Sequence, residues 1–219
     1  MDSTRPITTL EEVLARLDGT VAELVDTQSR LATCQAQLEE MNRLVFEQSA
    51  TDPLTGLKNR AAFERIMNQQ SARTGRTKSS LALLMVDVDK LQLYNDEFGR
   101  HGGDEVLQQV AQALKSHARA YDYVVRYQND EFAVVLPDTY VEGARVVAER
   151  VRSSVKAIRW RHRGMTVSVG AAGGVQNSTG ADLQDEGKTL TARAIAALAR
   201  AKGEGGDRVE ALNSLSSIF

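Results

Sequence analysis

The sequence predicts an α/β (α+β) domain preceded by a long coiled-coil helix, and three observations lead to this prediction. Leucines recur every seven residues through the first fifty positions, which is typical of a coiled coil. The apolar run Leu81–Val86 indicates a central strand that is buried on both faces. Helical and strand patterns alternate after it, and the strands expected at 121–127 and 131–136 are joined by a short turn. Helices that cover a sheet with an antiparallel hairpin define this fold class.

The first fifty residues are expected to form one helix that ends at Gln48. One set of heptad positions is apolar throughout: Leu10, Leu17, Leu24, Leu31, Leu38 and Val45. The complementary set begins apolar and then becomes polar: Leu14, Val21, Gln28, Gln35 and Asn42. Polar residues at such positions weaken a zipper and fix its register. A capping box at Thr8–Glu11 or Thr9–Glu12 marks the start of the helix. We therefore predict a parallel homodimer, with one amphipathic helix packed on its own domain as the alternative.

The composition bounds the class of protein. The 219 residues carry 27 lysines and arginines against 29 aspartates and glutamates, a formal charge of −2, so no net basic field is available for nucleic acid or an anionic membrane surface. Hydrophobic residues make up 42% and charged residues 26%, which are ordinary values for a globular chain. Cys34 is the single cysteine. It excludes an intrachain disulfide and a cysteine-rich zinc site, and it fits a reducing, cytoplasmic location.

The longest uninterrupted apolar runs, Leu81–Val86 and Ala194–Ala199, are far too short to cross a membrane. We expect neither a signal peptide nor membrane insertion. The chain is expected to divide into an N-terminal helix at 1–49 and a second domain at 50–219. Further elements expected in the second domain are helices at 60–70, 141–155 and 188–202, two helices after the central strand, and a strand at 165–171.

Acidic residues gather at two positions of the predicted sheet. Asp87 follows the buried strand, and Asp130 with Glu131 stands at the hairpin turn. Open α/β sheets place ligand groups at strand ends, so the three carboxylates can converge. Carboxylate oxygens suit Mg²⁺ or Mn²⁺, which would neutralise phosphate oxygens. The spacing alone fits solvated surface residues or helix caps equally well, and both interpretations stay open at this point.

Several motifs spaced along 50–210 resemble those of GGDEF domains. The segment Asp52–Arg60 (DPLTGLKNR) resembles the entry motif of that family, and Asp87–Asp104 resembles its first strand and nucleotide-binding helices. Arg126–Phe132 and Ser168–Ala172 resemble its hairpin and a later strand. The resemblance implies a nucleotidyl-cyclase-like fold with a central mixed sheet. The family contains diguanylate cyclases, which join two GTP molecules into cyclic di-GMP, and sequence-degenerate relatives that only bind nucleotide or regulate.

The resemblance implies roles residue by residue. Asp87 and Asp130 would hold the metal ions, the Val88 carbonyl and Glu131 would assist, and the three acids would serve catalysis. The substrate contacts that it implies are Asn95, Asp104, Arg126 and Arg193. Asn95 and Asp104 would bond the guanine edge, because a carboxylate that faces the guanine N1–H and amino group selects guanine over adenine. Capping of the adjacent helices is the structural alternative for these two side chains.

The sequence departs from the family at the motif that names it. Gln128 and Asn129 replace the two glycines, whereas Asp130 and Glu131 remain. Glycine at such a turn permits positive φ and leaves room for a ligand beside the backbone. Asparagine can replace only the first property, so we predict an intact fold with an obstructed nucleotide pocket. The segment Gly205–Asp207 stands in place of the usual Gly-Arg-Asn, which weakens triphosphate binding further.

A second site of the family is retained. Arg119–Asp122 (RAYD) resembles its inhibitory RxxD site, five residues ahead of the hairpin motif. Arg119 offers a planar fork for a phosphate and the N7/O6 edge of guanine, and Asp122 can accept from guanine N–H groups. Arg150 stands where relatives contribute a second arginine from a neighbouring subunit. A salt bridge at a helix end is the structural alternative for an R-x-x-D pattern.

These observations predict a dimeric, degenerate GGDEF domain that binds cyclic di-GMP through Arg119 and Asp122 and regulates an unidentified protein partner. An active diguanylate cyclase that uses GTP with Mg²⁺ or Mn²⁺ is the main alternative, because every acid is retained. A scaffold that binds no nucleotide is the third possibility. Neither nucleic acid nor a membrane is an expected partner.

Overall fold

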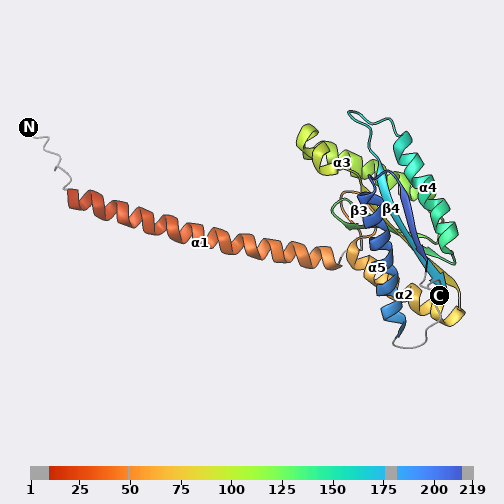
Figure 1. Ribbon diagram of the computed structural model, residues 1–219. Coiled ribbons are helices and arrows are strands. Elements are labelled where there is room, and N and C mark those ends of the chain that lie inside the picture. Colours follow the sequence, from red (N-terminus) through yellow and green to blue (C-terminus); the bar gives the residue numbers. More distant parts are fainter. Residues whose placement is uncertain (1–9, 49, 176–181, 214–219) are drawn as a thin grey trace, which may run out of the picture. The chain divides into compact units, whose positions relative to one another are not determined.

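The computed structural model describes residues 10–48, 50–175 and 182–213, and the chain divides into two compact units between Gln48 and Ser49. The first unit holds one helix, α1 (Leu10–Gln48), and the second holds a five-stranded sheet with four helices, α2 to α5 (Figure 1). The capping residues expected at Thr8 and Thr9 lie outside the described residues.

Helix α1 is continuous over the heptad region, and those of its apolar side chains that the structure describes face solvent in the single chain. Five residues of the predicted zipper are more than half exposed: Leu17, Val21, Leu24, Leu31 and Leu38. Burial of such side chains is the main driving force for association. The dimer itself remains a prediction.

The sheet has the order β2-β3-β1-β4-β5. Its strands are β1 (Ser80–Val88), β2 (Tyr123–Gln128), β3 (Glu131–Pro137), β4 (Val167–Val175) and β5 (Val209–Asn213). The central strand β1 pairs antiparallel with β3 and β4, whereas β4 pairs parallel with β5. This mixed sheet confirms the predicted fold class. Strand β5 was not predicted.

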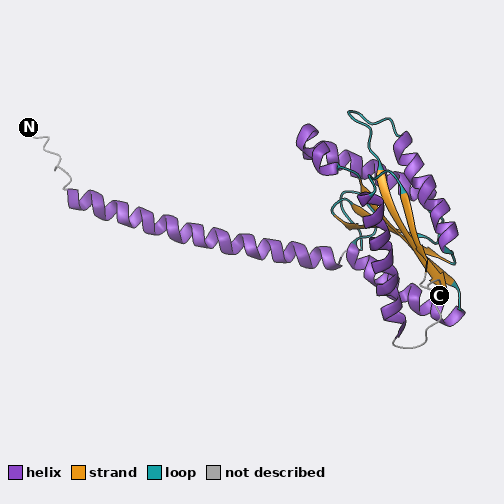
Figure 2. Ribbon diagram, viewed as in Figure 1, coloured by secondary structure: helices purple, strands orange, loops and turns teal. Residues whose placement is uncertain are grey.

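Helices cover both faces of the sheet in two layers (Figure 2). The helices are α2 (Arg60–Thr77), α3 (Leu91–His117), α4 (Val141–Ala157) and α5 (Asp182–Gly203). Alternate residues of β1 belong to two cores, since Ala82, Leu84 and Val86 pack with α3 and α4. Leu81 and Leu83 pack instead with α2 and α5. The prediction that this strand is buried on both faces is therefore correct.

Two glycines shape the layers around the site. Gly99 interrupts α3 at φ 80° and ψ 162°, so α3 consists of two helical segments, as predicted. Gly170 on β4 lets α5 approach the sheet, because a Cβ atom there would lie 2.2 Å from the Ala194 carbonyl oxygen and the Leu198 nitrogen. No larger residue fits at Gly170 without displacing α5.

Candidate functional site

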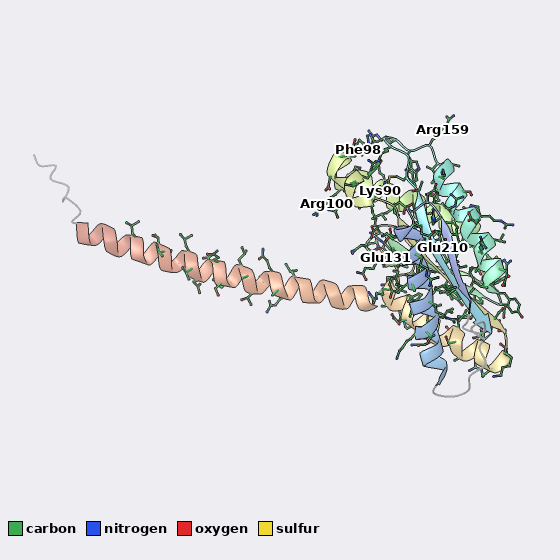
Figure 3. All side chains as sticks on the ribbon, viewed as in Figure 1. Lys90, Phe98, Arg100, Glu131, Arg159 and Glu210 are labelled. Carbon is green, nitrogen blue, oxygen red and sulfur yellow. The ribbon has the colours of Figure 1, made fainter. Side chains whose placement is uncertain are left out.

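The end of β1 brings together the acids that the sequence singled out. Asp87 is the register partner of Glu131 on β3, and the Val88 N–H donates to the Asp130 carbonyl oxygen at 3.3 Å. Figure 3 labels Glu131 near this end of the sheet, together with Lys90, which precedes α3. The expected convergence of the strand end with the hairpin turn is therefore present in the fold.

Asp87 is the most deeply buried of these acids, with a side chain only 4% exposed. Its Oδ2 accepts a hydrogen bond of 2.7 Å from Lys202 Nζ, whereas its Oδ1 is buried without a hydrogen-bond partner. Burial raises the pKa of Asp87 to about 6; the Lys202 ammonium opposes this rise, and the charges of Asp130 and Glu131 add to it. A carboxylate in this setting favours an additional cation.

The residues present fit a divalent cation that is shared with a nucleotide. Among the described side chains, no three histidine, cysteine, aspartate or glutamate residues form a complete metal cage. Mg²⁺ in phosphoryl-transfer sites is commonly held by one or two carboxylates together with substrate phosphates. The unpartnered Oδ1 of Asp87 is a suitable first ligand, and Asp130, Glu131 and the Val88 carbonyl are the neighbouring oxygen groups.

Lys202 is a site residue that sequence reasoning missed. It lies in the last turn of α5, and its ion pair with Asp87 joins positions 115 residues apart. Burial lowers its pKa, but the hydrogen bond and negative charge of Asp87, with the charges of Asp130 and Glu131, outweigh burial and raise it. The sequence placed this lysine at the end of the last predicted helix, but no motif near it in the sequence indicated a contact with Asp87.

Asp89, two residues after Asp87, has a structural role. Its carboxylate accepts from the Thr166 hydroxyl at 2.7 Å, the Ser168 hydroxyl at 2.6 Å and the Asp207 N–H at 3.0 Å. These bonds join the end of β1 to β4 and to the loop before β5. Asp89 therefore fixes the position of the strand end.

The turn at Gln128 and Asn129 has the conformation of a tight hairpin. Asn129 adopts φ 42°, the left-handed region that asparagine tolerates, as predicted. Arg126 donates to the Asn129 carbonyl oxygen from Nε at 3.0 Å and from Nη2 at 2.8 Å. Its Nη1 lies 3.2 Å from both carboxylate oxygens of Asp52. On the other side of the turn, Arg60 Nη1 donates to Gln128 Oε1 at 2.9 Å.

Arg126 thus holds the turn in place, since all three guanidinium nitrogens bond within the chain. The contact with substrate that the resemblance implied for Arg126 remains a prediction. Arg193, the other implied substrate cation, lies half-buried in α5, and its contact with substrate also remains a prediction.

The two residues assigned to guanine lie on either side of the kink in α3. Asn95 packs against Gly103, where an added Cβ would lie 1.8 Å from Asn95 Oδ1. That Oδ1 atom is buried without a hydrogen-bond partner, and Asp104 follows Gly103 directly. Gly103 therefore makes room for an amide beside Asp104, and the contact with guanine that the resemblance implied for Asn95 and Asp104 remains a prediction.

Arg119 and Asp122 form a compact turn after α3. The Arg119 N–H donates to Asp122 Oδ2 at 2.7 Å, and the Asp122 N–H donates to the Arg119 carbonyl at 3.1 Å. Asp122 Oδ1 is buried without a hydrogen-bond partner. Burial raises the pKa of Asp122 even though the backbone bond and charge of Arg119 lower it. The two side chains line a depression of about 420 Å³ that also includes Gly56, Lys58 and Lys115.

Comparison with known proteins decides the family. Residues 49–208 match the family model described as "Diguanylate cyclase, GGDEF domain". The chain belongs to the GGDEF domain family. Its mixed central sheet is thus that of a GGDEF domain.

Relatives extend the likeness beyond the GGDEF domain. The chain is 33% identical over 200 residues to diguanylate cyclase DgcP of Pseudomonas aeruginosa, covering 91% of this chain and 29% of that protein. A crystal structure of the coiled coil and GGDEF domain of DgcB from Caulobacter crescentus in complex with c-di-GMP has a TM-score of 0.68 at 26% identity, and the match covers 88% of this chain and 99% of that chain.

Diguanylate cyclase SiaD from P. aeruginosa, solved in complex with its activator SiaC, has a TM-score of 0.66 at 31% identity. That match covers 91% of this chain and 76% of that chain. The chain spans about a third or less of the length of DgcP and of diguanylate cyclase DosC.

Arg150 is exposed on α4 and is not among the residues that line the Arg119–Asp122 depression, so within one chain it does not join that site. No helix in the described ranges is both long enough and apolar enough to span a membrane.

Proposed function

We propose that this chain is a dimeric, cytoplasmic GGDEF protein that binds cyclic di-GMP at Arg119 and Asp122 and passes its occupancy to a protein partner, with little or no cyclase activity. The observation that carries the proposal is a contrast between two sites. The depression beside Arg119 is lined by Asp122, whose buried Oδ1 has no hydrogen-bond partner among the described residues, whereas the turn at Gln128 and Asn129 carries side chains in place of glycines.

The chemistry of the depression suits guanine. A carboxylate oxygen can accept from the N1–H and amino group of guanine, and Asp122 Oδ1 has no competing donor within the described chain. The Arg119 guanidinium can address a phosphate or the N7/O6 edge. The DgcB structures that resemble this chain are complexes with c-di-GMP, which supports the same ligand here. Arg150 of a second copy would complete the site.

The turn argues against binding of GTP in the catalytic position. A glycine pair lets phosphates approach the backbone, and amide side chains at the same two positions would project where such phosphates would lie. The bond from Arg60 to Gln128 Oε1 restrains the Gln128 side chain, so moving it aside costs a hydrogen bond. The Gly206 position also lacks the arginine that the family pattern supplies, and the triphosphate loses one more contact.

An active cyclase is the second candidate, and the acids at the end of β1 favour it. A divalent cation on Asp87, Asp130, Glu131 and the Val88 carbonyl would neutralise charge on the GTP phosphates and help to activate the ribose hydroxyl. Asn95 and Asp104 would orient the guanine. Lys202, already beside Asp87, would add a positive charge at the phosphates. The relatives named above as diguanylate cyclases support this candidate.

Dimerisation through α1 completes the proposal. The exposed leucines of the heptad repeat need a partner of matching period, and a second copy of the helix provides it. The DgcB chain, which also contains a coiled coil, matches over 88% of this chain. The stalk would then carry a signal into or out of the GGDEF domains.

The deciding experiment measures turnover and binding on the same full-length preparation. Chromatography after incubation with GTP and Mg²⁺ or Mn²⁺ quantifies cyclic di-GMP, and calorimetry measures the affinity of the chain for cyclic di-GMP and for GTP. We expect binding that Arg119→Ala abolishes and turnover at or near the level of Asp130→Ala. Turnover that disappears in Asp130→Ala would establish the cyclase instead. A chain that binds neither nucleotide would be a scaffold.

A further inference from the structure

We propose that Lys58 and Lys115 form a phosphate-binding subsite beside the Arg119–Asp122 pair. The depression would then take a guanine nucleotide with two phosphodiesters, a guanine on Asp122 and phosphates on the lysines. This inference rests on the proposed function and adds to it two residues, Lys58 of the entry motif and Lys115 of α3, to which the resemblance assigned no role.

The two lysines come from different segments and meet at one depression. Lys58 belongs to the entry segment before α2, and Lys115 lies in the last turn of α3. Both line the depression that Arg119 and Asp122 line. Lys115 Nζ donates to the Gly56 carbonyl at 3.4 Å, which places its ammonium at the wall formed by the entry segment.

The backbone at Lys58 is fixed before any ligand binds. Its N–H donates to the Val124 carbonyl at 3.3 Å, and its carbonyl accepts from the Arg126 N–H at 2.8 Å. These two bonds attach the entry segment to the edge strand β2. Asp122 immediately precedes this strand in the sequence. A lysine that starts from a fixed backbone loses less conformational freedom on binding than one on a mobile loop.

The charges of the depression match the proposed ligand. Its charged lining consists of Lys58, Lys115, Arg119 and Asp122, so its formal charge is +2. Over the described part of the chain, no carboxylate lies within ion-pair distance of either lysine, and each remains available to an anion. A cyclic dinucleotide carries one negative charge on each of two phosphodiesters. Opposite charges of equal size on site and ligand favour both affinity and fast association.

Two other anions could meet the same lysines. Inorganic phosphate lacks the base that Asp122 Oδ1 would bond, and 5′-GMP presents one phosphate to two ammonium groups. A ligand with one guanine edge and two separated phosphodiesters uses every group of the depression. We therefore expect cyclic di-GMP to bind more tightly than 5′-GMP, and inorganic phosphate to compete only weakly.

The test is calorimetry with cyclic di-GMP on the full chain at low and high ionic strength. Lys58→Gln and Lys115→Gln should each weaken binding about fivefold, as expected for a partly exposed charge-assisted contact. Both variants should also show a smaller dependence of affinity on salt. Lys78→Gln, which changes an exposed lysine at the far end of α2, is the matched control and should bind like the parent chain. Lys58→Arg and Lys115→Arg should retain binding, because the charge is kept.

The outcomes separate this inference from the proposed function. If the parent chain binds cyclic di-GMP and Arg119→Ala does not, but the double lysine variant binds like the parent, the subsite is wrong and the function stands. If the parent chain does not bind the dinucleotide, the proposed function fails. An arginine variant that binds as poorly as its glutamine counterpart, or 5′-GMP that binds as tightly as the dinucleotide, would overturn the phosphate assignment.

Discussion

Arg126 Nη1 lies 3.2 Å from both carboxylate oxygens of Asp52, and the same guanidinium holds the Asn129 carbonyl. The entry segment is thereby attached to the hairpin turn. Burial raises the pKa of Asp52, but hydrogen bonds from Thr55 and the charge and hydrogen bond of Arg126 outweigh burial, so the pKa lies below its ordinary value. The ion pair therefore contributes to stability only while Asp52 is ionised.

Asp52→Asn should lower the free energy of unfolding by about 1 to 2 kcal/mol at pH 7. Because the folded-state pKa lies below that of the unfolded chain, this contribution is fully present above the unfolded value of about 3.9 and is lost as pH falls through the folded value. Urea unfolding at pH 7 and pH 3 checks this. The two proteins should converge at low pH, and a gap that widened there would contradict the assignment.

Lys202→Met should tighten the binding of Mn²⁺ by severalfold at pH 8 in the absence of nucleotide. The ammonium lies 2.7 Å from Asp87 Oδ2, so it competes with a cation for the same carboxylate. Electron paramagnetic resonance of free Mn²⁺ gives the affinity. Arg200→Gln, an exposed change on the same helix, serves as control. Unchanged or weaker Mn²⁺ binding in Lys202→Met would show that the lysine does not compete.

Gln128→Gly combined with Asn129→Gly should strengthen GTP binding by about tenfold or more if the two amide side chains obstruct the pocket. The turn should persist, because glycine adopts the φ of 42° found at Asn129 without strain. Calorimetry with GTP and Mg²⁺ provides the measurement. Gln128→Asn with Asn129→Asp keeps two branched polar side chains and should not recover affinity. Equal affinity in the parent chain and the diglycine variant would remove the steric explanation.

Gly170→Ala should destabilise the GGDEF domain by about 3 kcal/mol. The added methyl group would lie 2.2 Å from backbone atoms of Ala194 and Leu198, and backbone cannot turn aside as a side chain can. Thermal unfolding monitored by circular dichroism measures the loss. Gly164→Ala is the comparison, since nothing lies within 4 Å of the Cβ position there. Equal melting temperatures would mean that α5 yields without cost.

Leu24→Asp should convert the proposed dimer into a monomer. Leu24 is 67% exposed in the single chain and occupies an apolar heptad position, where a buried charge is costly. Sedimentation equilibrium distinguishes the two states, and Glu23→Asp is a neutral comparison. Unfolding of the GGDEF domain should be the same in both variants. A parent chain that sediments as a monomer would contradict the coiled-coil prediction.

Hydrophobic period predicted most of the fold because the period reflects which faces are buried. The run Leu81–Val86 showed a strand buried on both faces, and its acidic end led to the convergence of Asp87 with the hairpin turn. Strand β5 was not predicted because Val209–Asn213 is short and contains two polar residues. It also pairs in parallel with β4, which is distant in sequence. The helix expected at 188–202 begins earlier, at Asp182.

The candidate site was predictable where a motif fixed the position of a residue. Asn129 could be expected to adopt positive φ from its chemistry alone. The bonds of Lys202 to Asp87 and of Arg126 to Asp52 could not be predicted from the sequence, because each joins residues that are distant in sequence. The structural role of Asp89 could not be predicted from the sequence for the same reason. It becomes visible only when Thr166 and Ser168 are seen to donate hydrogen bonds to its carboxylate.

The entry segment contributes residues to two sites. Its Lys58 lines the Arg119 depression, whereas its Asp52 bonds the arginine that supports the hairpin turn. A substitution confined to Gln128 and Asn129 leaves this shared segment unchanged. Deleting or rebuilding the entry segment would disturb both the Arg119 depression and the hairpin turn. Substitutions at the turn can therefore alter one site without the other, whereas a change in the backbone of the entry segment affects both.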